Sequence, residues 1–238
     1  MLFIRYLIIL LFIISIGFPQ QRKMKHLNVD EIDLKHLFFL PKDYYSAEKT
    51  TWPLILFLHG MGERGDDLEL VKIHGIPKIA EKQKDFPFIA VSPQCPTEYV
   101  WRDKKMLQAV ESLMLKIIKN YRIDKTRVYV TGLSMGGYGT WALAAHRPDL
   151  FAAAVPICGG GDPATVNVLK NLPIWVFHGG LDKVVLPKES EKMVRVLEKA
   201  GGKIQYTLYP EAYHDSWTET YNNPALYDWM LKNRKVDN

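Results

Sequence analysis

A β-branched apolar run meets the pattern Gly-x-Ser-x-Gly in Val128-Tyr129-Val130-Thr131-Gly132-Leu133-Ser134-Met135-Gly136, and a helix-forming stretch from Tyr138 to His146 follows. A strand, a tight turn that carries serine and a helix, in this order, are typical of a nucleophile elbow. The positions two before and two after the serine must be small, and Gly132 and Gly136 meet that need. The pentapeptide alone is a weak signal, but its setting makes Ser134 the candidate nucleophile.

Two further strand-loop units follow the elbow. An activated serine needs a base and an orienting acid, and in this architecture the chain order is Ser, then Asp or Glu, then His. The apolar run Pro173 to His178 predicts a strand, and Asp182 lies in the loop behind it. The run Ile204 to Tyr209 predicts the next strand, and His214 follows it. Asp182 and His214 are therefore the candidate acid and base.

An earlier apolar run, Pro53 to Leu58, ends in His59-Gly60-Met61-Gly62. An oxyanion hole in this architecture takes one backbone N–H from such a loop and one from the residue after the nucleophile. We therefore predict the amides of Met61 and Met135 as the oxyanion donors. We also expect His59 to brace this loop, and His178 to brace the acid loop, through ring hydrogen bonds.

With these residues in place, the chain resembles the α/β-hydrolase superfamily. More narrowly it is similar to small secreted esterases near the dienelactone-hydrolase and prolyl-oligopeptidase-like groups, including feruloyl and acetyl-xylan esterase relatives. The resemblance spans about Leu37 to Leu231, and its motifs are His59-Gly60-Met61-Gly62-Glu63-Arg64-Gly65, Ser92-Pro93-Gln94-Cys95-Pro96, the elbow, His178-Gly179-Gly180-Leu181-Asp182 and His214-Asp215-Ser216-Trp217. It implies nucleophile Ser134, acid Asp182 and base His214, with no cofactor, and it leaves the substrate open.

The alternation of strand and helix patterns predicts an α/β fold. We expect the α/β-hydrolase fold, with a mostly parallel central sheet, helices on both faces and no large lid. The expected strands are 36–40, 54–58, 88–92, 128–131, 152–157, 174–177 and 204–209, and the expected helices are 68–83, 104–121, 138–146, 187–200 and 224–232. Pro77 should bend or divide the helix over 68–83.

The N-terminus, residues 1–17, is predicted to be a secretory signal peptide, because a short start with one positive charge precedes an apolar stretch. Residues 18–238 then form one domain of a secreted or periplasmic protein with no stable membrane partner, and an uncleaved membrane anchor is the alternative. The formal net charge is +5, from 31 basic and 26 acidic residues. The basic residues are scattered, which argues against a nucleic-acid partner.

The two cysteines, Cys95 and Cys158, leave a disulfide open in an exported protein. In the strand order of the superfamily, two strands separate them, a span of about 14 Å against a limit of about 7 Å between bridged Cα atoms. Free, buried thiols are therefore favoured. The histidines show no metal-ligand spacing, so no metal site is expected. Asp162 is the competing candidate for the acid, and Asp215 is expected to cap a helix.

Four aromatic residues lie in or near loops on the predicted active-site side: Tyr99, Trp101, Tyr138 and Trp217. They either stack on a sugar or an aromatic acyl group, or pack in the interior. The sequence thus predicts an exported serine hydrolase that cleaves carboxylic esters of small molecules or oligosaccharides, with esters on plant polysaccharides as a hypothesis. The alternatives are a serine peptidase for short peptides and a non-catalytic binding protein on the same fold.

Overall fold

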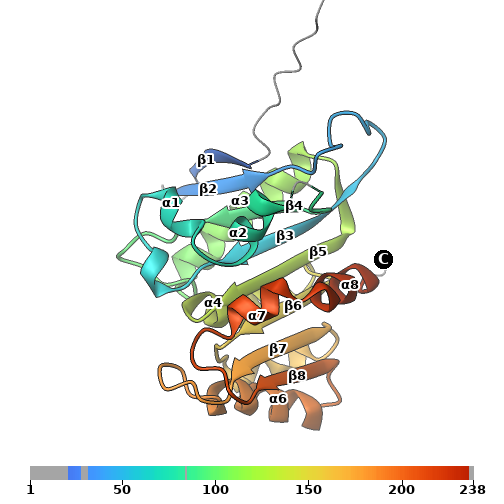
Figure 1. Cartoon of the computed structure of the whole chain (residues 1–238). Helices are drawn as coiled ribbons and strands as arrows, with labels where there is room; N and C mark the ends of the chain where they lie inside the picture. The colour runs from blue at the N-terminus through green and yellow to red at the C-terminus, as the bar shows by residue number, and fades with distance from the viewer. Residues whose placement is uncertain (1–20, 28–31, 84, 236–238) are drawn as a thin grey trace, which may run out of the picture.

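A computed structural model of the chain describes residues 21–27, 32–83 and 85–235. The predicted signal peptide, residues 1–17, lies outside the described residues. The described strands are β1 (Gln21–Leu27), β2 (Asp33–Phe39), β3 (Trp52–Leu58), β4 (Ile89–Pro93), β5 (Ile123–Leu133), β6 (Ala153–Ile157), β7 (Ile174–Gly179) and β8 (Ile204–Tyr209). They form one sheet in the order β1-β2-β4-β3-β5-β6-β7-β8 (Figure 1).

The sheet is mostly parallel. β1 pairs antiparallel with β2, and β2 pairs antiparallel with β4. Every other pairing, from β4 across to β8, is parallel. Parallel strands bring their carboxyl ends to one edge of the sheet, so the loops after β3, β5, β7 and β8 meet there. This edge carries the candidate site.

Alternate residues of the central strands enter two separate cores, one on each face of the sheet. In β3, Leu54, Leu56 and Leu58 belong to one core, and Ile55 and Phe57 to the other. Such continuously apolar strands need cover on both faces. The first core is covered by α3 (Lys104–Asn120), α4 (Met135–His146) and α6 (Lys188–Lys199), and the second by α2 (Gly75–Lys82), α7 (Trp217–Asn222) and α8 (Pro224–Lys232).

Four short elements complete the described part: η1 (Met61–Glu63), α1 (Leu68–Val71), η2 (Pro163–Thr165) and α5 (Val166–Leu169). No large lid covers the carboxyl ends of the strands within the described residues. The helices of the described part are all too short or too polar to cross a bilayer. The predicted fold class is confirmed.

The helix expected over 68–83 is two helices, α1 and α2, but the break lies at residues 72–74 rather than at Pro77. Pro77 sits in the first turn of α2, where backbone N–H groups have no partner within the helix. The N–H that proline lacks is therefore not needed there. Gly75 opens α2 with φ +65°, and a Cβ on it would lie 2.2 Å from the Phe57 ring. The chain therefore turns at a glycine pressed against β3.

Several described elements were not predicted: the short elements η1, η2 and α5, and also β1 and α7. β1 has the polar sequence Gln21-Arg22-Lys23-Met24-Lys25-His26-Leu27, which lacks an apolar run, and it forms because β2 offers a free edge. α7 is one short helix directly after the His214 loop. Asp215 accepts from the Thr218 backbone N–H at 3.0 Å, so it caps the start of α7 as expected for this residue.

Both cysteines are free and buried, as favoured from the sequence. Cys95 follows β4 and Cys158 follows β6, and β3 and β5 lie between those strands in the sheet. The strand order therefore keeps the two thiols apart.

Candidate active site

The turn between β5 and α4 holds Ser134 in a backbone conformation that non-glycine residues rarely adopt, φ +52° and ψ −115°. The flanking glycines make this turn possible. A Cβ on Gly132 would lie 2.4 Å from the Gly136 carbonyl oxygen, and a Cβ on Gly136 would lie 1.9 Å from the Leu58 carbonyl oxygen. β5 and α4 can approach this closely only without side chains at both positions, which is the geometry expected of a nucleophile elbow.

Gly136→Ala is expected to destabilise the protein by more than about 4 kcal/mol, because the new methyl group meets backbone atoms that cannot move aside. Thermal unfolding should show a melting temperature lower by roughly 10 °C or more, or no soluble protein. Gly62→Ala is the matched control, since a Cβ there has no heavy atom within 4 Å. Equal melting temperatures for the two variants would contradict this packing argument.

The structure brings the three predicted residues Ser134, Asp182 and His214 together. His214 Nδ1 lies 2.7 Å from Asp182 Oδ2, and His214 Nε2 lies 3.0 Å from Ser134 Oγ. Because a carboxylate only accepts, Nδ1 donates its proton to Asp182 and the Nε2 lone pair accepts from the serine hydroxyl. The imidazole is thus held in the tautomer that a general base needs.

The acid is fixed from several sides. The Asp182 side chain is fully buried, and its Oδ1 accepts from the backbone N–H groups of Val184 at 2.8 Å and Val185 at 3.0 Å. Oδ2 is left for His214, with His178 Nε2 at 3.3 Å on another side. These contacts fix the position of the carboxylate beside the imidazole.

His178 braces the acid loop, as expected from the sequence. Its Nε2 lies 2.8 Å from the Val185 carbonyl oxygen and its Nδ1 lies 2.7 Å from Ser190 Oγ. Burial lowers the pKa of His178, which keeps the ring neutral. Since a carbonyl oxygen only accepts, Nε2 carries the proton of this neutral ring.

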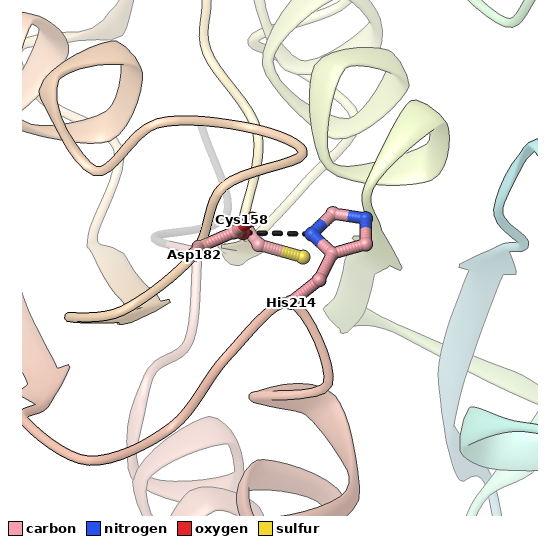
Figure 2. A group of neighbouring side chains, drawn as sticks. All are labelled: Cys158, Asp182 and His214. Atoms are coloured by element: carbon pink, nitrogen blue, oxygen red, sulfur yellow. Dashed lines mark hydrogen bonds and ion pairs between the residues drawn. The ribbon is translucent and has the colours of Figure 1, made fainter.

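Cys158 lies beside the acid and the base, a placement that the sequence analysis missed (Figure 2). Ligand atoms of Cys158, Asp182 and His214 all lie within 4.8 Å of one another, so these are the described residues that come near a metal-binding arrangement. However, burial raises the pKa of the Cys158 thiol, and metal ligation needs the thiolate. Asp182 and His214 are also bonded to each other. The arrangement therefore favours proton transfer over metal binding.

The loop after β3 is held by His59, as the sequence predicts for this residue. His59 Nε2 accepts from the Cys95 backbone N–H at 3.0 Å, so Nδ1 carries the proton and donates to the Gly60 carbonyl oxygen at 2.6 Å. The Trp101 indole N–H donates to the His59 carbonyl oxygen at 2.9 Å. Met61, the first residue of η1, and Met135, the first residue of α4, both line the pocket of Ser134.

The burial of His59 predicts that the free energy of unfolding depends on pH. Burial lowers its pKa from 6.5 to about 4, so the unfolded chain binds a proton more readily than the native protein. The resulting stabilisation is complete above pH 6.5 and is lost as the pH falls through about 4, an effect of about 3 kcal/mol. Urea unfolding at pH 7 and pH 4.5 should show this loss, and a His59→Gln variant should show a smaller loss. An equal loss in both proteins would contradict the assignment.

A pocket of about 650 Å³ opens above Ser134, and we call it the catalytic pocket. It is lined by Met61, Val100, Trp101, Arg102, Ser134, Met135, Tyr138, Val184, Val185 and Glu189. Trp101 and Tyr138 were predicted for substrate binding, and both lie on its wall. Tyr99 and Trp217 were also predicted, but they do not line it.

The two aromatic residues outside the catalytic pocket pack elsewhere. Tyr99 packs against the first core, and its carbonyl oxygen accepts from Arg64 at 3.3 Å. The Trp217 ring contacts the His214 ring edge-on, with 5.1 Å between ring centres. Of the two alternatives left open by the sequence, Tyr99 therefore follows packing in the interior, and Trp217 contacts the base rather than the catalytic pocket. The sequence analysis missed Arg102 and Glu189, because single charged residues in loops and on helix faces carry no motif.

Asp162, the competing candidate for the acid, caps η2 instead, accepting from the Ala164 backbone N–H at 2.9 Å. Its loop follows β6, one strand short of β7 in the sheet. The acid that bonds to His214 is therefore Asp182, in the loop that follows β7.

Comparison with known proteins identifies the family of the chain. The family model described as the dienelactone hydrolase family matches residues 76–229. The chain belongs to the dienelactone hydrolase family. The matched residues include Ser134, Asp182 and His214, and the predicted resemblance to α/β-hydrolase esterases is confirmed.

Similar proteins include members with esterase names. "Probable acetylxylan esterase A" of Aspergillus fumigatus is 26% identical over 181 residues, which are 62% of this chain and 47% of that protein. The crystal structure of a thermostable esterase is 35% identical with a TM-score of 0.79, over 91% of this chain and 64% of that one. The solved structure of a ferulic acid esterase, at 17% identity and TM-score 0.65, covers 88% and 96% and shares the fold. This dienelactone hydrolase family chain thus spans less than two thirds of the first two proteins.

Proposed function

We propose that this chain is a serine hydrolase that cleaves carboxylic esters through an acyl-enzyme. The observation that carries the proposal is the hydrogen-bonded series Ser134 Oγ, His214 Nε2, His214 Nδ1, Asp182 Oδ2, with separations of 3.0 and 2.7 Å on either side of the imidazole. Membership of the dienelactone hydrolase family and the esterase names of similar proteins support the reaction class.

In the first step, Ser134 Oγ attacks the ester carbonyl carbon and His214 Nε2 takes the hydroxyl proton. Asp182 stabilises the imidazolium that forms, while the carbonyl oxygen becomes an oxyanion. The C–O bond to the alcohol then breaks, and the alcohol oxygen leaves with the proton from Nε2. The acyl group remains on Ser134, and no cofactor takes part.

We assign the Met61 and Met135 amides as the oxyanion donors. The Met135 N–H belongs to the first turn of α4, where amides lack partners within the helix and favour negative charge. Met61 is likewise the first residue of its helix, η1. The loop before η1 is held by the hydrogen bonds of His59 and Trp101 described above. Donors fixed before the reaction need no reorganisation as charge develops.

In the second step, water replaces the alcohol. His214 Nε2 accepts a proton from water, whose oxygen attacks the acyl carbon, and the tetrahedral intermediate collapses to release the carboxylic acid and restore the Ser134 hydroxyl. The name of a similar protein, acetylxylan esterase, supports short acyl groups on a polysaccharide as candidate substrates.

The test is hydrolysis of p-nitrophenyl esters, from acetate to longer acyl chains, by purified protein at neutral pH. We expect release of p-nitrophenol, with the chain-length optimum reporting the size of the catalytic pocket. A folded protein that cleaves no ester of the series would overturn the proposal, and cleavage of short peptides alone would favour the peptidase alternative.

A further inference from the structure

A second pocket of about 580 Å³ adjoins the catalytic pocket, and the two share Arg102, Tyr138 and Glu189. Ser134 lines the catalytic pocket and not the second one. The remaining wall of the second pocket includes Trp141, Gly160, Gly161 and Thr165. The two pockets are therefore neighbours, and a molecule that occupied both, with its ester group at Ser134, would contact these three residues.

Two charged side chains, Arg102 and Glu189, stand at this boundary. Within the part of the chain that the structure describes, neither Arg102 nor Glu189 makes a side-chain hydrogen bond or an ion pair. Arg102 lies over the Tyr138 ring instead, with its guanidinium carbon 5.8 Å from the ring centre. One strong donor and one strong acceptor are therefore both available to a ligand.

Tyr138 adds a hydroxyl and a ring to the same boundary. Burial first, and then the Glu189 carboxylate, raise the pKa of Tyr138, and Arg102 opposes them. The phenol thus stays protonated and can both donate and accept. A Cβ on Gly160 would lie 3.1 Å from the Tyr138 ring and 3.2 Å from Glu189 Cβ. The missing side chain at Gly160 lets both residues stand at the boundary.

The chemistry of this boundary selects among ligands. A neutral polyhydroxylated ligand can accept from Arg102, donate to Glu189 and place a ring face near Tyr138. An apolar alcohol would remove water from both charges without replacing its hydrogen bonds, which is unfavourable. A charged alcohol would be repelled by one of the two. Hydroxyl groups on an uncharged ring satisfy all three side chains.

The catalytic pocket itself has a different character. Beside Ser134 its wall includes Met61, Val100, Val184 and Val185, which are apolar. This wall suits the acyl portion of an ester. The second pocket lacks these apolar residues and adds His146, Asp162 and Thr165, so it is left for the alcohol portion. We propose that the second pocket binds the alcohol portion of the substrate as a neutral saccharide, with Arg102, Tyr138 and Glu189 as specificity-determining residues. This inference rests on the proposed ester hydrolysis.

The experiment compares two acetates, p-nitrophenyl acetate and acetylated xylotriose, for the full chain and its Glu189→Gln and Arg102→Gln variants. We expect the ratio of kcat/KM for the saccharide ester to kcat/KM for p-nitrophenyl acetate to fall about tenfold or more in each variant, through a raised KM. A lost charge-assisted hydrogen bond should act on binding rather than on the bond-breaking steps.

Glu191→Gln and Arg195→Gln are the matched controls. Both residues lie on α6 with Glu189, pair with each other at 3.4 Å and line neither pocket, so the ratio should not change. An unchanged ratio in Glu189→Gln and Arg102→Gln would overturn the inference. So would cleavage of p-nitrophenyl acetate without cleavage of acetylated xylotriose by the unmodified chain, while the proposed function would stand. Cleavage of neither acetate would instead count against the proposed function.

Discussion

Ser134→Ala is expected to reduce kcat for p-nitrophenyl ester hydrolysis by about six orders of magnitude. The variant has no hydroxyl to form the acyl-enzyme, and His214 then has no nucleophile to activate. A small rate above that of water should remain, because the oxyanion donors and the pocket still bind the transition state of direct attack by water. Initial rates over a range of substrate concentrations would measure both quantities.

The control for this prediction is Ser46→Ala. Ser46 is an exposed serine remote in sequence from the site, and its hydroxyl donates to the Asp43 carbonyl oxygen at 3.2 Å. Its loss should leave kcat unchanged. Alanine can keep the turn of the elbow, so Ser134→Ala should also fold, as circular dichroism would show. Full activity in folded Ser134→Ala would rule out the proposed nucleophile.

Asp182→Asn is expected to lower kcat by about four orders of magnitude while leaving KM nearly unchanged. Oδ1 of Asp182 accepts two backbone N–H groups, from Val184 and Val185, so the oxygen of an asparagine would take that position. Its NH2 group would then face His214 Nδ1 and donate to it. The imidazole would have to carry its proton on Nε2, which turns a donor toward the Ser134 hydroxyl and removes the base.

Asp162→Asn is the matched variant at the competing candidate for the acid. That carboxylate caps the start of η2 and has no contact with His214, so the variant should keep its activity on a short p-nitrophenyl ester. If Asp162→Asn lost more activity than Asp182→Asn, the acid would have been assigned to the wrong loop.

The main features of the fold could be predicted because the decisive residues act locally. Continuous apolar runs identify buried parallel strands, and β8 has the predicted bounds Ile204–Tyr209. β1 could not be predicted, because its polar residues form a strand only where the edge of β2 is available. The break between α1 and α2 was misplaced, because proline is easily accommodated in a first turn and Gly75 was not recognised as the turning point.

Some residues of the candidate site could likewise be predicted from the sequence, and others could not. Ser134, Asp182 and His214 could be named because chain order and the position after a strand are properties of the sequence. The wall of the pocket could not be predicted, because Arg102 and Glu189 come from separate segments and meet only in three dimensions. Cys158 was considered only as a disulfide partner, and its place beside His214 depends on how the loops after β6, β7 and β8 fold together.

The burial of both cysteines has a practical consequence. Burial raises the pKa of Cys95 to about 12 and raises that of Cys158 as well, so neither thiol offers the thiolate that maleimides and iodoacetamides attack. A single cysteine placed on an exposed helix face would therefore be the preferred target for a fluorophore or a spin label at neutral pH. The wild-type chain can serve as the background for such labelling, with neither native cysteine replaced.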